Sequence, residues 1–352
     1  MTQTSMDVAT EAFRAEHEAL RSNAVWFDLS DRGKVKISGR HRVRFLHGML
    51  THDVKNLEVG RARTCTIVTD TGKMVVDLNL INRGDFFICD VEPLAAKTLI
   101  DRLKHYKVAE NVEFEDISGS MGHLSIQGPM AREVVATLLK IPDFSLSSLS
   151  VMDTTLENDV AVTVMRLSRT GEDGYDLFLG ANHLLWVTSR IGELLPHVQK
   201  ASAAVLETAR IEAGIPKLGA ELDETIFPLE AGLYHALSYS KGCYVGQEAL
   251  VMMTDRGQPP KTLVTLLFRG DGAPPRPGGV LTLHGKAVGR VTSVCNSPRV
   301  GGLLGLGYVK TRVAAGDDAL NVEGTSWEAV RTPLGIGWGS GEKPAVEPRV
   351  MK

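Results

Sequence analysis

The chain has 352 residues, of which 43% are hydrophobic and 23% are charged, and its formal net charge is -3. A chain of this length is expected to form two or three domains with ordinary hydrophobic cores. Its acidic balance argues against a general binder of nucleic acid or of membrane surfaces. The sequence holds no run of about 18 apolar residues, so no transmembrane helix is predicted.

The cysteines are far apart in the sequence, which argues against a disulfide framework, a zinc ribbon or an iron–sulfur cluster built by this chain alone. They are Cys65, Cys89, Cys243 and Cys295. No metal site is predicted. The N-terminus is polar and acidic and lacks a signal-peptide pattern, so a cytoplasmic protein is expected.

The first part of the chain predicts a helix, a strand and a hairpin. Residues 11–22 have the pattern of an amphipathic helix, and residues 34–37 alternate as a half-buried strand does. Residues 65–68 and 74–81 predict a hairpin around the turn residues 70–73.

Asp77 stands in the middle of the second hairpin strand. Because side chains alternate along a strand, it shares a face with Asn79, opposite to Val76 and Leu78. An unpaired buried charge is very costly, so this carboxylate must face solvent, a partner or a pocket. An ion pair with a surface lysine is the simpler interpretation, and a functional carboxylate is the alternative.

The region 121–213 predicts a similar series of strands, hairpin and helix, which hints at two related lobes. Residues 269–279 are rich in glycine and proline, and the short alternating runs after them predict a small β-barrel. The predicted fold class is therefore α+β. We expect two lobes in residues 1–258, a C-terminal barrel in residues 259–340 and a mobile tail in residues 341–352.

Positive charge is concentrated between Arg32 and Arg44. The simpler interpretation is a solvated face, and the alternative is a surface for an anionic ligand tail or for RNA.

The octet at residues 241–248 combines a lysine, a thiol, a phenol, an amide and a carboxylate with two glycines. Glycines allow unusual dihedrals and close approach, and a lysine two residues from a cysteine is able to stabilise a thiolate. The simpler interpretation is a turn before a helix, with Cys243 as a small buried hydrophobe. The octet reads Lys241-Gly242-Cys243-Tyr244-Val245-Gly246-Gln247-Glu248.

This octet resembles the K-G-C-[YF]-x-G-Q-E signature of the YgfZ-type, folate-binding branch of the glycine-cleavage T-protein superfamily. Further blocks resemble the superfamily in the same order along the chain: residues 27–30, 72–77, 168–175, 210–216, 228–233 and 289–308. Lys73 replaces a glycine of the family's hairpin motif, as in the YgfZ branch, and the loop before Tyr175 is a few residues shorter than in the family. The resemblance implies a T-protein-like cloverleaf, with two α+β lobes and a barrel around a central folate cavity.

The resemblance also implies tetrahydrofolate as the cofactor and assigns roles to individual residues. Asp77 corresponds to the family's catalytic carboxylate, beside the reactive N5 and N10 atoms. Glu172 is implied to accept the N–H donors of the pterin, and Arg210 to hold the anionic glutamate tail. Tyr175 and Lys241 are further cofactor-binding candidates.

The first functional hypothesis is a tetrahydrofolate-binding protein that supports assembly or repair of iron–sulfur enzymes, with Cys243 as its reactive catalytic thiol. Folate and iron–sulfur client proteins are the expected partners, and a monomer without a membrane or nucleic-acid partner is expected.

The alternative is a folate-dependent aminomethyltransferase or methyltransferase of the T-protein type, favoured by Asp77 and the run 172–175. A non-catalytic RNA-binding module is the third hypothesis. Whether bound folate turns over or only binds stays open.

Overall fold

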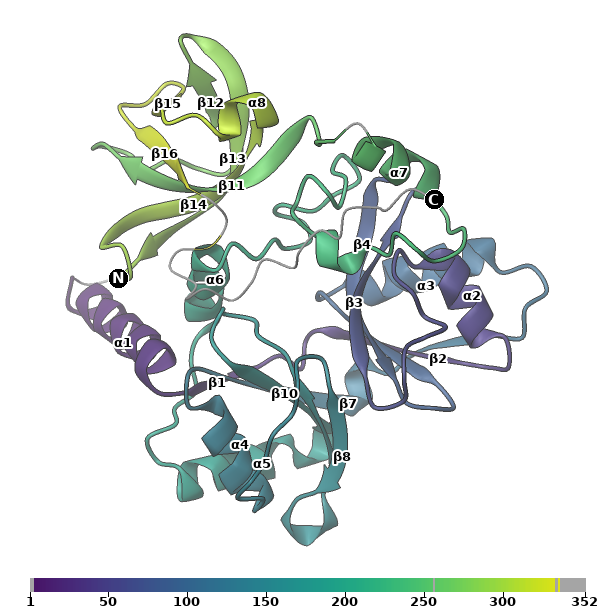
Figure 1. Ribbon diagram of the computed structural model, residues 1–352. Helices are drawn as coiled ribbons and strands as arrows, with labels where there is room; N and C mark the ends of the chain where they lie inside the picture. Colours follow the sequence, from purple (N-terminus) through teal and green to yellow (C-terminus); the bar gives the residue numbers. More distant parts are fainter. Residues whose placement is uncertain (1–2, 256, 333–334, 336–352) are drawn as a thin grey trace.

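The computed structural model describes residues 3–255, 257–332 and 335. It arranges the chain as three bodies around a centre: two α+β lobes and a closed β-barrel (Figure 1). The predicted fold of two α+β lobes and a C-terminal barrel is confirmed. The predicted mobile tail, residues 341–352, lies outside the described residues. Within the described residues, no helix has both the length and the apolar character needed to cross a membrane.

The first lobe is a five-stranded antiparallel sheet with the order β3-β4-β5-β2-β6, accompanied by helices α2 and α3. Val76, Leu78 and Leu80 of β4 are buried in its core, which confirms the predicted alternation along this strand. Its elements are β2 (Gly33–Ser38), α2 (Arg42–Met49), β3 (Ala62–Val68), β4 (Met74–Asn82), β5 (Phe87–Val91), α3 (Ala95–Tyr106) and β6 (Glu113–Asp116).

The second lobe is a five-stranded antiparallel sheet with the order β1-β7-β10-β9-β8, packed against helices α4 and α5. Strand β1 precedes the whole first lobe in the chain but pairs with β7, so the N-terminal segment crosses between the lobes. The elements are β1 (Val25–Asp28), β7 (Met121–Gln127), α4 (Ala131–Leu139), β8 (Val151–Thr155), β9 (Ala161–Arg166), β10 (Gly174–Gly180) and α5 (Leu184–Leu194).

The third body is a closed barrel with the strand order β11-β14-β13-β12-β15-β16. Helix α6 lies between this barrel and the lobes (Figure 1), and its Ile211 packs against Leu304 and Leu306 of β14. The barrel elements are β11 (Lys261–Arg269), β12 (Val280–Leu283), β13 (Lys286–Ser297), β14 (Gly302–Lys310), α8 (Thr311–Ala314), β15 (Leu320–Val322) and β16 (Glu328–Thr332). The remaining helices are α1 (Gln3–Ser22), α6 (Ala203–Glu212) and α7 (Gln247–Asp255).

A buried ionic network joins the two lobes. Asp90 of β5 is fully buried and accepts hydrogen bonds from Arg32 at 2.8 and 3.1 Å and from Arg169 of the second lobe at 2.8 Å. Arg169 also donates to Asp176 of β10, whose carboxylate lies 3.3 Å from His123 of β7. Burial alone raises the pKa of Asp90, but the two guanidinium groups hold it well below its ordinary value. The carboxylates and guanidinium groups of the network are therefore ionised at neutral pH, whereas burial lowers the pKa of His123 and keeps its imidazole neutral.

The beginning of the basic stretch 32–44 belongs to this buried region. Arg32 and Lys34 are both buried, so the predicted solvated face is wrong at these two positions. The Lys34 ammonium donates to the carbonyl oxygens of Leu29 and Ser30, at 3.1 Å each, and burial lowers the pKa of Lys34 to about 8. These two cations fix the connection between the lobes and are not available to nucleic acid.

We expect Asp90→Asn to lower the free energy of unfolding by about 3–5 kcal/mol, because it leaves two buried guanidinium groups without their shared anion. Urea denaturation at pH 7 measures this loss. Asp101→Asn removes one partner of the exposed Lys97–Asp101 pair on α3 and is the matched control, with an expected change within about 0.5 kcal/mol. An Asp90→Asn protein as stable as the wild type would contradict the role of the network.

Candidate folate site

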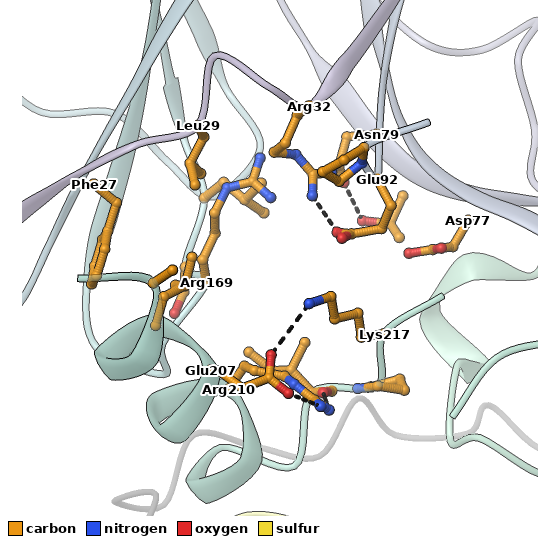
Figure 2. Close-up of a pocket in the computed structure, with 18 of the residues that line it drawn as sticks. Phe27, Leu29, Arg32, Asp77, Asn79, Glu92, Arg169, Glu207, Arg210 and Lys217 are labelled. Carbon is orange, nitrogen blue, oxygen red and sulfur yellow. Dashed lines mark hydrogen bonds and ion pairs between the residues drawn. The ribbon is translucent and has the colours of Figure 1, made fainter. Parts of the chain in front are cut away.

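A central cavity of about 840 Å³ lies between the two lobes and the segment 200–235 that contains α6. This volume is in the range of small-molecule sites, roughly 300–1,000 Å³. Its apolar walls include Phe27, Leu29, Leu206 and Leu233. Its charged lining residues include Arg32, Asp77, Glu92, Arg169, Glu207, Arg210 and Lys217 (Figure 2).

Asp77 reaches the cavity from the middle of β4, as does Asn79. One carboxylate oxygen of Asp77 is buried and has no hydrogen-bond partner among the described residues. Burial and the nearby Glu92 carboxylate raise the pKa of Asp77 to about 6. A group with this pKa exchanges protons readily near neutral pH. The simpler interpretation, an ion pair with a surface lysine, does not describe this residue.

Arg210, predicted to hold the ligand's tail, does line the cavity. Its guanidinium already donates to Glu221 and Ser293 at 2.7 Å each, and it also donates to Glu207 and to the carbonyl oxygen of Ile215. Its side chain is only 6% exposed. These contacts tie α6 to the barrel through both terminal nitrogens, while Nε is buried and has no hydrogen-bond partner among the described residues. The predicted role of Arg210 in holding the ligand's tail stays a prediction.

Lys217 is a cavity cation that the sequence analysis missed, as are Arg169 and Lys200. Its side chain is 45% exposed, and its ammonium lies 3.3 Å from a Glu207 oxygen. Figure 2 shows its ammonium directed toward Glu207, with that contact dashed. Lys217 follows Gly214 and Pro216, where the chain leaves α6, and this position alone does not mark a cavity residue.

Three of the predicted folate contacts, Glu172, Tyr175 and Lys241, are not among the residues that line the cavity. Glu172 lies outside the lining residues and accepts a 2.7 Å hydrogen bond from Arg21 of α1. Tyr175 is fully buried in the core of the second lobe, where burial raises its pKa to about 12. The structure therefore does not bring either residue to Asp77, and their binding roles stay predictions.

The octet is docked on the first lobe, away from the cavity lining. The Lys241 ammonium donates to the carbonyl oxygens of His47, Leu50 and His52, at the end of α2, where carbonyl groups lack helical partners. Burial lowers the pKa of Lys241 to about 8. Cys243 is a free, exposed cysteine, so the interpretation as a buried hydrophobe is wrong. The lysine supports α2 and lies outside the cavity lining, and its cofactor-binding role stays a prediction.

Two glycines let the octet pack on the turn of the β3–β4 hairpin. Gly246 has a φ of +78°, and a Cβ there would lie 2.3 Å from the carbonyl oxygen of Thr69. Gly72, also at φ +78°, would place a Cβ 3.2 Å from the Gly246 carbonyl oxygen. Only glycine suits this approach. The octet is thus connected to the strand that carries Asp77.

Comparison with known proteins identifies the family. Residues 4–241 match the "GCVT N-terminal domain", and residues 261–333 match the "Glycine cleavage T-protein C-terminal barrel domain". The chain belongs to the glycine-cleavage T-protein family. The predicted superfamily is therefore confirmed.

The curated T-protein relatives include the aminomethyltransferase of Geobacillus kaustophilus, which is 33% identical over 318 residues, 88% of this chain and 85% of that protein. Another is the aminomethyltransferase of Thermoanaerobacter sp., which is 29% identical and covers 88% of this chain and 84% of that protein. The crystal structure of glycine cleavage system aminomethyltransferase T from Bartonella henselae superposes with a TM-score of 0.81. It is 22% identical, covers 92% of this chain and 88% of that one, and shows the shared fold. These relatives are aminomethyltransferases by name, and the YgfZ branch stays a prediction.

We expect Asp77→Asn to raise the free energy of unfolding at pH 8 by about 1–3 kcal/mol, because a buried carboxylate without a partner is costly when ionised. The folded pKa of about 6 exceeds the ordinary 3.8. The contribution of Asp77 to wild-type stability is therefore most favourable when the carboxyl is protonated, and it falls as the pH rises between about 4 and 6.

Urea denaturation of wild type and Asp77→Asn at pH 8 and pH 4 tests the predicted direction in which the stability contribution of Asp77 changes with pH. The difference between the two proteins should shrink to about 0.5 kcal/mol at pH 4, where the folded carboxyl is protonated. A gain of the same size at both pH values would be inconsistent with an unpartnered, titrating carboxylate.

Proposed function

We propose that this protein binds tetrahydrofolate in the central cavity and transfers a one-carbon unit there, as a folate-dependent aminomethyltransferase of the T-protein type. The observation that carries this proposal is the half-buried Asp77 carboxylate at the cavity, one oxygen of which is buried without a hydrogen-bond partner among the described residues. Buried polar groups are normally hydrogen-bonded, so such an oxygen points to a ligand donor. The names of the relatives support the reaction class.

The cavity suits the parts of a reduced folate. The flat pterin and aminobenzoyl rings fit between apolar walls such as Phe27, Leu206 and Leu233. An N–H group of the ligand can donate to the unpartnered oxygen of Asp77. The glutamate tail is anionic and needs an accessible cation, which Lys217 provides at the cavity mouth. The volume, the orphan carboxylate and the cation together fit the ligand.

The chemistry of this chain centres on proton transfer at Asp77. Bound tetrahydrofolate supplies the N5 and N10 nitrogen atoms that receive the one-carbon unit. With a pKa of about 6, Asp77 is mostly ionised at neutral pH and can take up a proton from a reacting nitrogen or stabilise positive charge on the transferred carbon. Glu92 raises and Arg32 lowers the pKa of Asp77. Their mutual ion pair therefore tunes this carboxylate.

We expect the purified protein, given tetrahydrofolate and an aminomethyl-lipoyl donor, to release ammonia faster than the uncatalysed reaction. Asp77→Asn should lower the rate constant by about 100-fold or more, because general acid–base groups contribute about 10²–10⁴-fold. A matched control is Asp70→Asn, in the exposed turn of the same hairpin, which should keep the wild-type rate. Ammonia release at the uncatalysed rate by the wild type would refute transferase activity.

A second candidate function, support of iron–sulfur enzymes as in the YgfZ branch, rests on a separate observation. The octet presents Cys243 as an exposed thiol on a loop held in place by Lys241 and Gly246. An exposed thiol on a well-anchored loop is accessible to a partner protein. Its sulfur can also replace another ligand of a metal ion. Both candidate functions include folate binding at Asp77. A requirement for the Cys243 thiol therefore distinguishes the second candidate from the first.

Complementation of cells that lack the protein tests the second candidate. If the thiol acts on iron–sulfur enzymes, Cys243→Ala should fail to restore their activity, while Cys295→Ala, at a partly buried barrel cysteine, should restore it at equal expression. Full rescue by Cys243→Ala would remove the second candidate and leave the transferase proposal untouched.

A further inference from the structure

His235 is the single histidine among the described residues that line the central cavity. It belongs to a single-turn 3₁₀ helix, Tyr234–Ala236, and the residue is exposed where it borders the cavity. Its imidazole has no hydrogen-bond or ion-pair partner among the described residues. An imidazole without a partner is free to exchange a proton with a molecule bound beside it.

Hydrogen bonds connect this short helix to the strand pair that carries Asp77. Thr66 of β3 is the cross-strand partner of Asp77, and its hydroxyl lies 3.0 Å from the Thr51 hydroxyl. The Thr51 hydroxyl donates to the carbonyl oxygen of Ala236 at 2.7 Å. His235 is therefore anchored, through its neighbour Ala236, next to the part of the cavity where Asp77 lies.

The imidazole is suited to both uptake and release of a proton. Removal from bulk water lowers the pKa of His235 below its ordinary value, so the imidazole is mostly neutral at neutral pH. It is then able to take up a proton, and the imidazolium that results is a stronger acid than usual. Two acids of the same lining are less free, because Glu92 is held by Arg32 and Glu207 by Arg210.

The proposed transfer requires two proton movements. Bonds form from the one-carbon unit to N5 and N10 of the folate, with loss of one proton from each nitrogen. In the aminomethyl-lipoyl donor, the C–S and C–N bonds break, and each electron pair leaves with the sulfur or the nitrogen. One proton completes the thiol and the other completes ammonia. A carboxylate carries one proton at a time, so a second acid–base group can serve the second leaving group.

We propose that His235 is this second acid–base residue. Its imidazole takes up one proton released at the folate and gives it to the departing sulfur, while Asp77 transfers the other proton to the amine. A lipoyl group is joined to its carrier by the end away from the aminomethyl carbon, so its sulfur lies on the solvent side of that carbon. His235 is exposed and Asp77 is half-buried, which matches this order. The assignment rests on the proposed function.

Protection from diethyl pyrocarbonate, which modifies accessible neutral imidazoles, tests the placement of His235. At a tetrahydrofolate concentration about ten times its measured Kd, modification of His235 should slow about tenfold, because about a tenth of the sites stay empty. Peptide mass spectrometry follows each histidine separately. His197, exposed and outside the cavity lining, is the control and should react equally with and without the ligand. Unchanged modification of His235 at saturation would overturn the assignment.

Rescue by added imidazole tests the chemistry. His235→Ala should bind tetrahydrofolate as the wild type does and lower the rate constant of thiol release about 100-fold, a size typical of general acid–base groups. Imidazole in the assay should restore His235→Ala about tenfold and leave Asp77→Asn unchanged, because a small base replaces only the missing imidazole. His197→Ala is the control and should keep the wild-type rate.

The outcomes separate this assignment from the proposed function. A His235→Ala protein with the wild-type rate, or a slow one that imidazole does not rescue, would overturn the assignment, while an active wild type upholds the transferase. A wild type that releases neither thiol nor ammonia would overturn the proposed function and the assignment with it.

Discussion

One buried carboxylate, Asp90, holds the two lobes in the arrangement that creates the central cavity. It is shared by Arg32 from the first lobe and Arg169 from the second. Burying such charges is favourable only when every partner is in place, so the network favours a single relative position of the lobes. Asn79 also donates to Asp90, at 3.3 Å, which ties the network to the strand that carries Asp77. The geometry of the cavity is therefore a consequence of this interaction.

Asp77 differs from the other buried acids described in the structure. Glu212, for example, accepts hydrogen bonds from His17 and Arg21, and these lower its pKa to about 2 although burial opposes them. Asp77 has a raised pKa and an oxygen without a partner among the described residues. Glu212 is thus paired with cationic or hydrogen-bonding side chains, whereas one oxygen of Asp77, at the cavity, has no hydrogen-bond partner among the described residues. Such local costs are typical of functional sites, where stability is given up for activity.

The sequence predicts the side-chain positions that depend on local pattern. It does not predict positions that depend on interaction partners from distant segments of the chain. Period-two alternation placed Asp77 on the cavity face of β4, and the same rule on β10 puts Tyr175 with Leu177 in the core. The resemblance suggests a cofactor contact for Tyr175, and this role stays a prediction for a side chain that lies in the core. By contrast, Glu172 lies away from the cavity because Arg21, about 150 residues earlier in the chain, pairs with it. Lys217 was missed for the same reason, since a lysine after a helix stop has no local pattern that marks it as a cavity residue.

The central claim is that a pterin occupies the cavity next to Asp77. A crystal structure of the protein with 5-formyltetrahydrofolate, a stable reduced folate, tests it most directly. The account predicts ligand density between the lobes and α6, with an N–H or NH2 nitrogen of the pterin within hydrogen-bonding distance, about 2.7–3.2 Å, of the unpartnered Asp77 oxygen. A cavity that holds only solvent at saturating ligand, or a ligand bound elsewhere on the surface, would contradict it.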